Sequence, residues 1–257
     1  MEKLSVAIPS SALINETDEK IKIYKLGIIA RALAIFRVEE VIIYRDPILD
    51  ETELIKEVLE YLETPQYLRK ELIPLSRTLR FVGVIPPLAI PSHKSKHLKI
   101  GELREGVVKK VAPDGTRWVD IGVDALAPLK CEEPRGARVT VRVVSKTPLL
   151  VEKAKPEEYW GYRVREAELE EVLRRKDVIV TSRKGRVPRP EEVRKGTFVF
   201  GNPKEGVPEI MKRMGIEMNV ETWNTIPMQG VRTVRLEEAI LCTLSIVNFL
   251  SFRGGLE

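Results

Sequence analysis

The first sixty residues alternate short apolar runs with longer stretches in which apolar side chains recur at helical spacing. Leu4–Ile8 (LSVAI) and Val41–Tyr44 (VIIY) are continuous apolar runs of strand length. Between them, Asp18 is a predicted cap for a helix over residues 19–36. Residues 51–63 form a charged, amphipathic helical pattern. Strand, helix, strand and helix in this order predict an α/β sheet.

The apolar period changes to two between residues 92 and 162. A proline-rich stretch, VIPPLAIPS, leads into this segment. The turn signals Asp114-Gly115 and Arg135-Gly136 separate three strand-like runs, GVVKKVAP, RWVDIGV and RVTVRVVS. Closely spaced short strands of this kind predict a small β-barrel, an OB-like domain inserted over residues 92–162.

The α/β pattern resumes after the predicted barrel. The expected elements are a helix, two short buried strands and a further helix, at residues 166–175, 178–181, 198–200 and 207–214. One discontinuous α/β domain, residues 1–91 and 163–257, is therefore predicted around the insertion.

The final predicted helix, residues 236–252, is apolar around most of its circumference. A helix with this pattern is buried on more than one side. Either it is central to its own domain, or one side packs in the core and the other in a subunit interface.

Composition narrows the classes of protein that remain. Hydrophobic residues make up 43% and charged residues 32% of the 257 positions, which excludes a disordered chain. Two cysteines and two histidines make neither a disulfide framework nor an easy zinc site, so no metal is expected. The sequence lacks a long apolar run, which predicts no membrane span, no signal peptide and a cytoplasmic location.

Positive charge is concentrated in the predicted insertion. From Ser92 to Arg165 there are 16 Lys or Arg against 10 Asp or Glu, and the rest of the chain is nearly neutral. A basic segment suits a nucleic acid, although a well-solvated surface has the same composition. His93 and His97 lie four residues apart, but without a nearby carboxylate or cysteine they read better as a basic linker than as metal ligands.

Three loops in the C-terminal part are candidates for ligand binding: TSRKG from Thr181, FGNPKEGV from Phe200 and NTIPMQGVRT from Asn224. The dinucleotide, P-loop and nucleophile-elbow motifs are absent. Each of the three loops follows a predicted strand, and ligands of open α/β sheets bind beyond the carboxyl ends of strands. Glycines in such loops let the backbone approach a ligand closely.

The second and third of these loops carry a resemblance. FGNPKEGV followed by NTIPMQGVRTVRLEEAILCTL resembles the second and third motifs of the SPOUT class of S-adenosylmethionine-dependent methyltransferases. KLGIIARALAIF, RTLRFVGVIPPLAIPSH and the inserted barrel are similar to one SPOUT family, the archaeal and eukaryotic RNA methyltransferases with an OB-like insertion, some assigned as RNA uridine-N3 methyltransferases. The resemblance covers essentially the whole chain.

The resemblance implies a fold, a reaction and an assembly. The expected fold is α/β with a deep trefoil knot in the C-terminal part. The expected reaction is methylation of RNA, at a uridine N3 in ribosomal RNA and hence in rRNA processing, with S-adenosyl-L-methionine as cofactor. The expected assembly is a homodimer with the active site at the subunit interface, which would explain a final helix that is apolar on all sides.

The resemblance also implies roles for the loop residues. Backbone around Gly201, Thr225, Ile226 and Gly230 would hold adenine and ribose, and Ile226 and Pro227 would form an apolar wall. Glu205 would bond a ribose hydroxyl or the cofactor amine, or else cap the following helix. The full predicted cofactor set is Thr181, Ser182, Arg183, Gly201, Glu205, Gly206, Asn224, Thr225, Ile226, Pro227 and Gly230.

Arg31 is the predicted catalytic residue. It lies in GIIARA, an otherwise apolar helical stretch in which an arginine is costly without a partner. Its guanidinium would stabilise negative charge on uracil oxygens as N3 loses its proton. The alternative is a salt bridge at the edge of the apolar stripe. No histidine is suitably placed as a general base.

The basic insertion is the predicted RNA-binding part. Trp118 would stack on a base or belong to the barrel core. The predicted RNA contacts are Lys109, Lys110, Arg117, Arg138 and Arg142. Two alternatives to an RNA methyltransferase remain open at this point: a non-catalytic RNA-binding or ribosome-assembly protein on a SPOUT scaffold, and a protein methyltransferase.

Overall fold

The computed structural model describes residues 3–74 and 76–252, and the chain forms two compact units. Unit 1 takes the described residues up to 60, then 78–88, then those from 162 onward. Unit 2 takes residues 61–77 and 89–161. The second unit therefore includes a stretch that precedes the insertion predicted from sequence, and its C-terminal boundary lies one residue from the predicted one.

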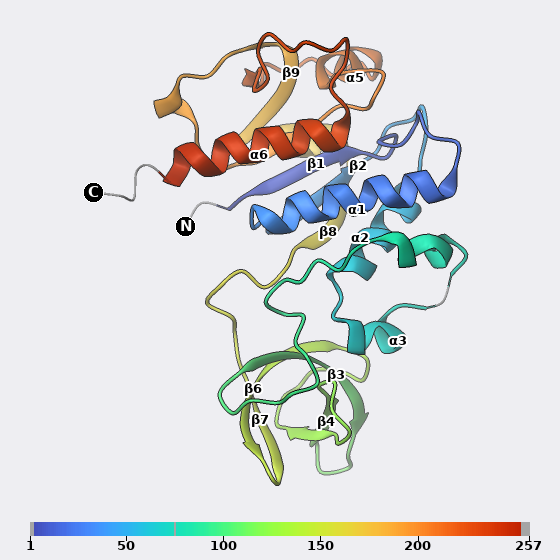
Figure 1. Ribbon diagram of the computed structural model, residues 1–257, viewed down its shortest axis with the longest axis vertical. Coiled ribbons are helices and arrows are strands. Elements are labelled where there is room, and N and C mark those ends of the chain that lie inside the picture. The colour runs from blue at the N-terminus through green and yellow to red at the C-terminus, as the bar shows by residue number, and fades with distance from the viewer. Residues whose placement is uncertain (1–2, 75, 253–257) are drawn as a thin grey trace. The chain divides into compact units, whose positions relative to one another are not determined.

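Unit 1 is built on a parallel sheet of six strands in the order β11-β9-β10-β1-β2-β8 (Figure 1). Its strands are β1 (Ser5–Pro9), β2 (Glu40–Tyr44), β8 (Arg163–Ala167), β9 (Val178–Arg186), β10 (Thr197–Val199) and β11 (Thr222–Trp223). The central strands are buried along their length, as expected for parallel strands covered on both faces.

The helices that begin in unit 1 are α1 (Glu19–Ile35), α2 (Thr52–Glu63), α4 (Leu169–Leu173), α5 (Val207–Arg213) and α6 (Leu236–Phe252), with 3-10 turns at Thr78–Val84 and Pro190–Glu192. The predicted cap of α1 is confirmed. The Asp18 carboxylate accepts hydrogen bonds from the backbone N–H of Lys20 and Ile21, at 2.7 and 3.1 Å. These bonds satisfy two of the donors that a helix start leaves unpaired.

Alternating side chains of the sheet bury two layers of core. One set, which includes Ala7, Ile42 and Val180, packs against α4 and α5. The opposite face is the side on which α1 and α6 pack against each other (Figure 1). The sheet is thus sandwiched between helices, which keeps its backbone ladder away from water.

A short segment of unit 1, residues 78–88, lies in the sequence between the two stretches of unit 2 and packs on α1. Gly27 makes this possible, because a Cβ at that position would lie 2.6 Å from the side chain of Ile85. Arg31 of the same helix donates a hydrogen bond from Nη1 to the Leu88 carbonyl at 2.8 Å. The segment that carries the proline-rich stretch is therefore anchored to unit 1.

Two predicted elements were wrong in extent. Residues 163–167 form strand β8 at the sheet edge, so the helix expected over 166–175 is reduced to α4. Ion pairs hold this edge strand, with Arg165 bonded to Glu40 at 3.0 Å and Glu166 to Lys56 at 2.6 Å. Strand β9 runs on to Arg186, through the loop expected at TSRKG, and β11 pairs with it on both sides of that stretch, at Val180 and at Arg186.

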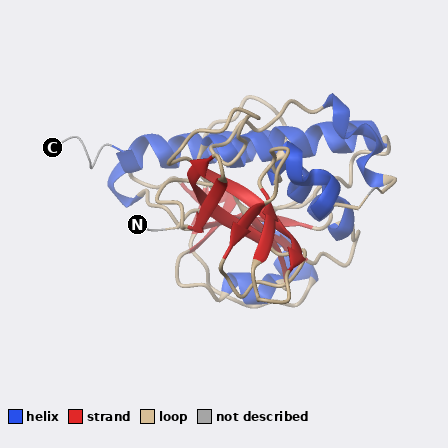
Figure 2. Cartoon of the chain, turned by 90° about the horizontal axis from the view of Figure 1, so that it is seen from below, coloured by secondary structure: helices blue, strands red, loops and turns tan. Residues whose placement is uncertain are grey.

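Unit 2 is an antiparallel sheet of five strands in the order β5-β4-β3-β6-β7. Its elements are β3 (Leu103–Val111), β4 (Arg117–Asp120), β5 (Ala127–Leu129), β6 (Arg138–Lys146), β7 (Leu149–Lys153), a 3-10 turn at Gln66–Leu68 and α3 (Arg69–Leu72). The two edge strands approach each other, so the sheet curls towards a barrel around an aliphatic core (Figure 2). The predicted Asp114-Gly115 turn joins β3 to β4, with Gly115 at φ +85°.

Candidate functional site

The three candidate loops meet in one cavity of unit 1. Strands β9, β10 and β11 are neighbours in the parallel sheet, so their carboxyl ends lie at the same edge. Beyond that edge is a cavity of about 340 Å³, lined by residues of all three loops and by Leu236, Ala239 and Thr243 of α6. Segments separated by more than forty residues in the sequence therefore share one concave site.

Short hydrogen bonds fix the loops to one another. The Asn224 side chain donates to the Arg183 carbonyl at 3.0 Å, and the Asn224 N–H donates to the Arg186 carbonyl at 2.7 Å. The hydroxyls of Thr225 and Thr243, both buried, lie 2.7 Å apart and tie the third loop to α6. The walls of the cavity are consequently set by contacts within the protein before any ligand binds.

Glycine is required in the second loop for a steric reason. A Cβ on Gly201 would lie 2.3 Å from the Glu205 carbonyl oxygen and 2.7 Å from Gly206 Cα, so the loop closes on itself only without a side chain there. Gly230 differs: a Cβ at this position meets no protein atom within 4 Å. The fold therefore gives a reason for Gly201 and none for Gly230.

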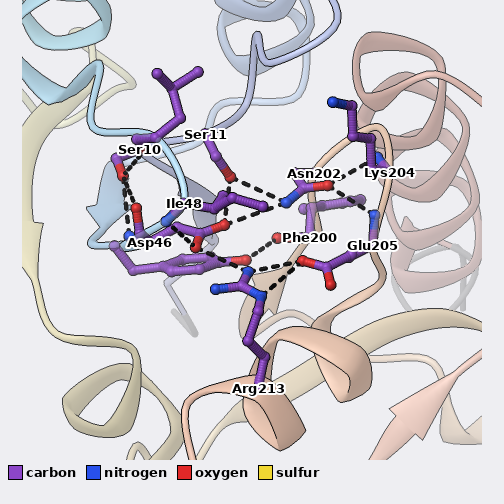
Figure 3. A network of polar contacts seen from close by, with 11 residues as sticks. Ser10, Ser11, Asp46, Ile48, Phe200, Asn202, Lys204, Glu205 and Arg213 are labelled. Atoms are coloured by element: carbon purple, nitrogen blue, oxygen red, sulfur yellow. Dashed lines mark hydrogen bonds and ion pairs between the residues drawn. The ribbon is translucent and has the colours of Figure 1, made fainter.

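A buried polar network holds the second loop in place (Figure 3). Asp46, just after β2, is fully buried, and its carboxylate accepts hydrogen bonds from Ser11 at 2.5 Å, Asn202 at 3.2 Å and Arg213 at 2.9 Å. The Asn202 side-chain oxygen in turn accepts from the backbone N–H of Lys204 and Glu205, at 2.8 and 2.7 Å. Asp46 thus organises a loop more than 150 residues away in the chain.

The charge on Asp46 is stabilised by this network. Burial opposes ionisation, but hydrogen bonds from the Ser11 hydroxyl and the Ile48 N–H, together with the Arg213 guanidinium, outweigh it. The pKa of Asp46 consequently lies below its usual range. A carboxylate that stays ionised keeps its acceptors available to the loop throughout the neutral range.

Both carboxylates that line the cavity are paired with cations. Glu205 accepts two hydrogen bonds from Arg213, at 2.7 and 3.0 Å, and does not cap α5, whose cap position is Gly206. Glu209 is bonded to Lys184 at 2.6 Å, and this bond lowers the pKa of Glu209. The lowered pKa makes Glu209 a weak proton acceptor, unsuited to act as a general base, and Glu205 is occupied by its two hydrogen bonds with Arg213.

The structure brings most of the predicted cofactor residues together. Nine of the eleven line the cavity: Thr181, Ser182, Arg183, Gly201, Glu205, Gly206, Asn224, Thr225 and Ile226. Pro227 and Gly230 are exposed and do not line it. Its apolar surface comes from Phe200, Trp223, Ile226, Val234 and Leu236.

Arg31 lies elsewhere in unit 1. It is half-buried on α1, bonded to the Leu88 carbonyl, and it does not line the cavity of its own chain. Its neighbours on the outer side of the helix, Tyr24 and Ile35, are more than half exposed. Arg31 therefore belongs to an exposed, partly apolar helix face.

The five predicted RNA contacts have different surroundings in unit 2. Lys109 is paired with Glu71, and Arg142 lies 3.7 Å from Glu152. Arg117 donates to the backbone carbonyls of residues 115, 132 and 133. Lys110 is exposed, and no hydrogen bond or ion pair of its side chain is found within the described residues.

Of the five predicted RNA contacts, Arg138 has the most acidic partners. Its guanidinium bonds both Glu63, at 2.6 and 3.0 Å, and the buried Glu105. Glu105 also accepts hydrogen bonds from Thr140 and Trp160. Burial raises the pKa of Glu63, although Arg138 opposes that shift. Arg138 thus joins α2 to the strands β3 and β6 within unit 2.

Sequence reasoning missed the residues that support the cavity: Ser11, Asp46 and Arg213. Their signal is weak, because each is a common residue in a loop or on a helix. One clue was available, since Asp46 directly follows the buried strand run VIIYR, at the edge where ligands of α/β sheets bind.

A family model described as "Putative RNA methyltransferase" matches residues 3–247. The chain belongs to this RNA methyltransferase family. An uncharacterized protein of Halobacterium salinarum is 34% identical over 93% of this chain and 96% of its own length. The 28S rRNA (uridine-N(3))-methyltransferase of Homo sapiens is 30% identical over 94% of this chain and 77% of its own, and that of Drosophila melanogaster is 32% identical over 94% and 61%.

A solved structure titled "Structural insights into the 2-OH methylation of C/U34 on tRNA" aligns with 98% of the chain at 12% identity and a TM-score of 0.40. That likeness is too low to establish a shared fold. Among the residues that the structure describes, no cluster of three or more His, Cys, Asp or Glu is placed to hold a metal ion. Nor does any helix in the described ranges have the length and apolar character needed to cross a membrane.

Proposed function

We propose that this member of the RNA methyltransferase family transfers a methyl group from S-adenosyl-L-methionine to N3 of a uridine in ribosomal RNA. The observation that carries the proposal is the convergence of three separate segments on one cavity: residues 181–185 of strand β9 and the loops 200–207 and 224–233. The target is proposed because the human and Drosophila relatives are named 28S rRNA (uridine-N(3))-methyltransferases.

The cavity fits the proposed cofactor. Its volume lies within the range of small-molecule sites, and such sites combine apolar walls with a few polar groups. Phe200, Ile226 and Leu236 would receive the adenine, and Thr181, Ser182 and Asn224 would offer polar contacts. The cradle at Gly201, which a Cβ would fill, leaves loop backbone accessible to the ligand. S-adenosylmethionine, when bound, supplies an electrophilic methyl group on a sulfonium.

The protein's part in the reaction is to position the uracil and to stabilise the charge that forms on it. N3 must lose its proton to solvent before it can form the new bond to carbon, and negative charge then spreads to the flanking carbonyl oxygens. Because Glu205 and Glu209 are paired with cations, we assign no side-chain base. Fixed guanidinium groups would favour the deprotonated base instead.

We further propose a homodimer on the SPOUT plan, with the C-terminal loops knotted. Two adjacent helices leave large apolar side chains exposed: Ile21, Tyr24 and Ile35 on α1, and Leu241, Phe249 and Phe252 on α6. A second copy would cover this surface. Arg31 lies on the same side of α1 as Tyr24 and Ile35, so pairing would place it in the subunit interface. Its proposed catalytic role requires that it face the partner's cavity there.

Unit 2 is proposed to bind RNA as an OB-like domain. Its strand β3 pairs with both β4 and β6, and its edge strands β5 and β7 approach each other, as in a partly open five-stranded barrel. Oligonucleotides bind OB-folds over the second and third strands and the adjoining loops. Trp118 on β4 and the exposed Lys110 are the best-placed candidates for that contact, Trp118 being only partly buried.

Transfer of label from methyl-tritiated S-adenosylmethionine tests the function. Ribosomal RNA and total protein serve as acceptors, and digestion of the labelled RNA identifies the nucleoside. We expect label in 3-methyluridine. Label in protein would replace the proposal by a protein methyltransferase, and no label together with no S-adenosylhomocysteine binding would leave an RNA-binding scaffold.

Light scattering tests the assembly. We expect twice the chain mass of 29.2 kDa for the native protein and a monomer for Phe249→Glu. The matched control is Val187→Glu, an exposed apolar residue of unit 1 outside α1 and α6, which should remain a dimer. A native monomer at concentrations that support methyl transfer contradicts the proposed interface.

A further inference from the structure

The cavity carries an excess of positive charge that its proposed cofactor does not explain. Four cations line it, Arg183, Lys184, Lys204 and Arg232, against the two carboxylates of Glu205 and Glu209. Lys184 is paired with Glu209, and Glu205 is paired with Arg213, which lies outside the lining. Both negative charges of the cavity are therefore already balanced.

Three cations of the cavity have no acidic partner among the described residues: Arg183, Lys204 and Arg232, all exposed. Arg183 donates from Nη1 to the Arg232 carbonyl at 3.2 Å, which places the first and third loops side by side. The Lys204 side chain points away from the Asp46 network, whereas Glu205 beside it points towards Arg213 (Figure 3). The loop thus presents a cation outward and turns its carboxylate inward.

This arrangement differs from the rest of the same region. On strand β9, three residues after Arg183, Arg186 is bonded to both Glu192 and Glu221. Arg194 shares Glu221. Arg186 and Arg194 are therefore paired with acids, whereas Arg183 and Arg232, which line the cavity, are not within the described part of the chain.

The cofactor does not account for three such charges. S-adenosylmethionine carries one carboxylate against a sulfonium and an ammonium group, so its net charge is positive. A cleft lined by one sign of charge attracts the opposite sign. A phosphodiester offers a full negative charge with oxygens for both guanidinium and ammonium donors, and it has no positive group to repel them.

We infer that Lys204 and Arg232, with Arg183 beside them, form a subsite for the backbone phosphate next to the target nucleotide. The inference rests on the proposed function and adds a substrate contact to the cofactor cavity itself, separate from the RNA surface proposed for unit 2. The subsite would hold the RNA strand at the mouth of the cavity, so that one base enters it. Bound phosphate positions a nucleic acid without reading its sequence.

The test uses the full chain and an oligouridylate RNA as probe. Lys204→Gln and Arg232→Gln, singly and together, are compared with Lys212→Gln, an exposed lysine of α5 that does not line the cavity. RNA affinity is measured by fluorescence anisotropy over a range of KCl concentrations. Thermal unfolding of each variant checks that it folds.

We expect the double variant to bind RNA about tenfold more weakly at low salt. The slope of log association constant against log salt concentration should fall by about 0.7, since the subsite neutralises one phosphate and each single-strand phosphate contact contributes about 0.7. Lys212→Gln should leave the slope unchanged. A double variant with native affinity and slope overturns the subsite, whatever the methyl-transfer assay shows.

Calorimetry with S-adenosylhomocysteine and with 5′-methylthioadenosine, which lacks the amino-acid part, separates the two ligands that these cations could serve. We expect both nucleosides to bind the variants as they bind the native protein. If the variants lose S-adenosylhomocysteine but keep 5′-methylthioadenosine, the cations hold the cofactor carboxylate and the inference is wrong. A slower single-turnover rate with unchanged RNA affinity would assign them to the uracil anion instead. If the native protein binds neither nucleoside, the proposed function fails, while the salt slope still judges the phosphate contact.

Discussion

The two units place their positive charge differently. Unit 2 holds the excess of basic residues in the sequence, yet Arg138 lies between Glu63 and Glu105, and Lys109 and Lys153 are paired with Glu71 and Glu133. The cavity of unit 1 belongs to a part of the chain that is nearly neutral, and three of its cations have no acid within the described residues. The net charge of a segment therefore does not show which of its cations lack an acidic partner.

The largest effect should come from Arg138→Leu. Removal of the guanidinium leaves Glu63 and Glu105 uncompensated in unit 2, and breaking a buried pair costs about 4 kcal/mol of unfolding free energy. We expect hydrogen exchange to rise across β3 and β6, with S-adenosylhomocysteine binding retained. A stable variant with selectively weaker RNA binding would show instead that Arg138 is an RNA contact.

Asp46→Ala should give a smaller loss of stability but abolish cofactor binding. The variant leaves Arg213, Ser11 and Asn202 without their shared acceptor, at a cost of about 3 kcal/mol. Calorimetry with S-adenosylhomocysteine measures the binding, and urea unfolding measures the stability. The control Asp50→Ala removes an exposed carboxylate that bonds only Thr52 among the described residues, and it should change neither quantity markedly. A folded Asp46→Ala protein that binds S-adenosylhomocysteine with native affinity would show that the network is not needed for cofactor binding.

The contributions of the Asp46 and Glu63 carboxylates to stability should depend on pH in opposite directions. The pKa of Asp46 is lowered from 3.8, so its contribution to stability is complete above that value and is lost as the pH falls. The pKa of Glu63 is raised from 4.5, so its contribution is present below 4.5 and is lost as the pH rises through its higher value. Urea unfolding from acid to neutral pH measures the difference in unfolding free energy between the native protein and each variant. The difference from Asp46→Asn should shrink as the pH falls. The difference from Glu63→Gln should shrink as the pH rises.

The smallest expected effect is that of Lys110→Gln. Lys110 is exposed, and within the described residues its side chain has no hydrogen bond or ion pair to lose, so stability should stay within about 0.5 kcal/mol of native. RNA affinity should fall about two- to threefold, with the salt slope reduced by about 0.7. Lys153→Gln is a useful comparison, because its ammonium is paired with Glu133 and contributes less to a polyanion site. Equal effects of the two variants would contradict the division between paired and unpaired cations.

Much of the fold follows from apolar periodicity. The strands at Ser5–Pro9 and Glu40–Tyr44, the Asp18 cap and the final helix agree with the sequence pattern, because each depends on nearby residues. Strand β8 was missed, since its sequence RVREA is polar and it becomes a strand only by pairing with β2 and forming ion pairs there. The local pattern of apolar residues does not show that a segment will pair with a distant strand.

Prediction of the candidate site from the sequence has the same limit. The loops that line the cavity carry glycines and could be found, and nine of eleven predicted residues line it. The residues that support the cavity could not be predicted from the sequence, because the hydrogen bond between Asp46 and Arg213 joins residues 167 positions apart. The count of charges over residues 92–165 has the same limit, because it includes Arg138 but only one of its two acidic partners: Glu105 lies in that segment and Glu63 lies outside it.

The order in which the cavity is assembled has a consequence for synthesis. Chains are made from the N-terminus, and domains fold as units when their residues are available. All of unit 2 precedes residue 162, whereas the cavity needs residues from Thr181 to Thr243, and α6 must reach back to pack on α1. A chain made only as far as residue 161 can therefore have the whole of unit 2 while its parallel sheet still lacks four strands, β8 to β11. Such a chain would carry the unit proposed to bind RNA before any residue of the proposed methyl-donor cavity had been made.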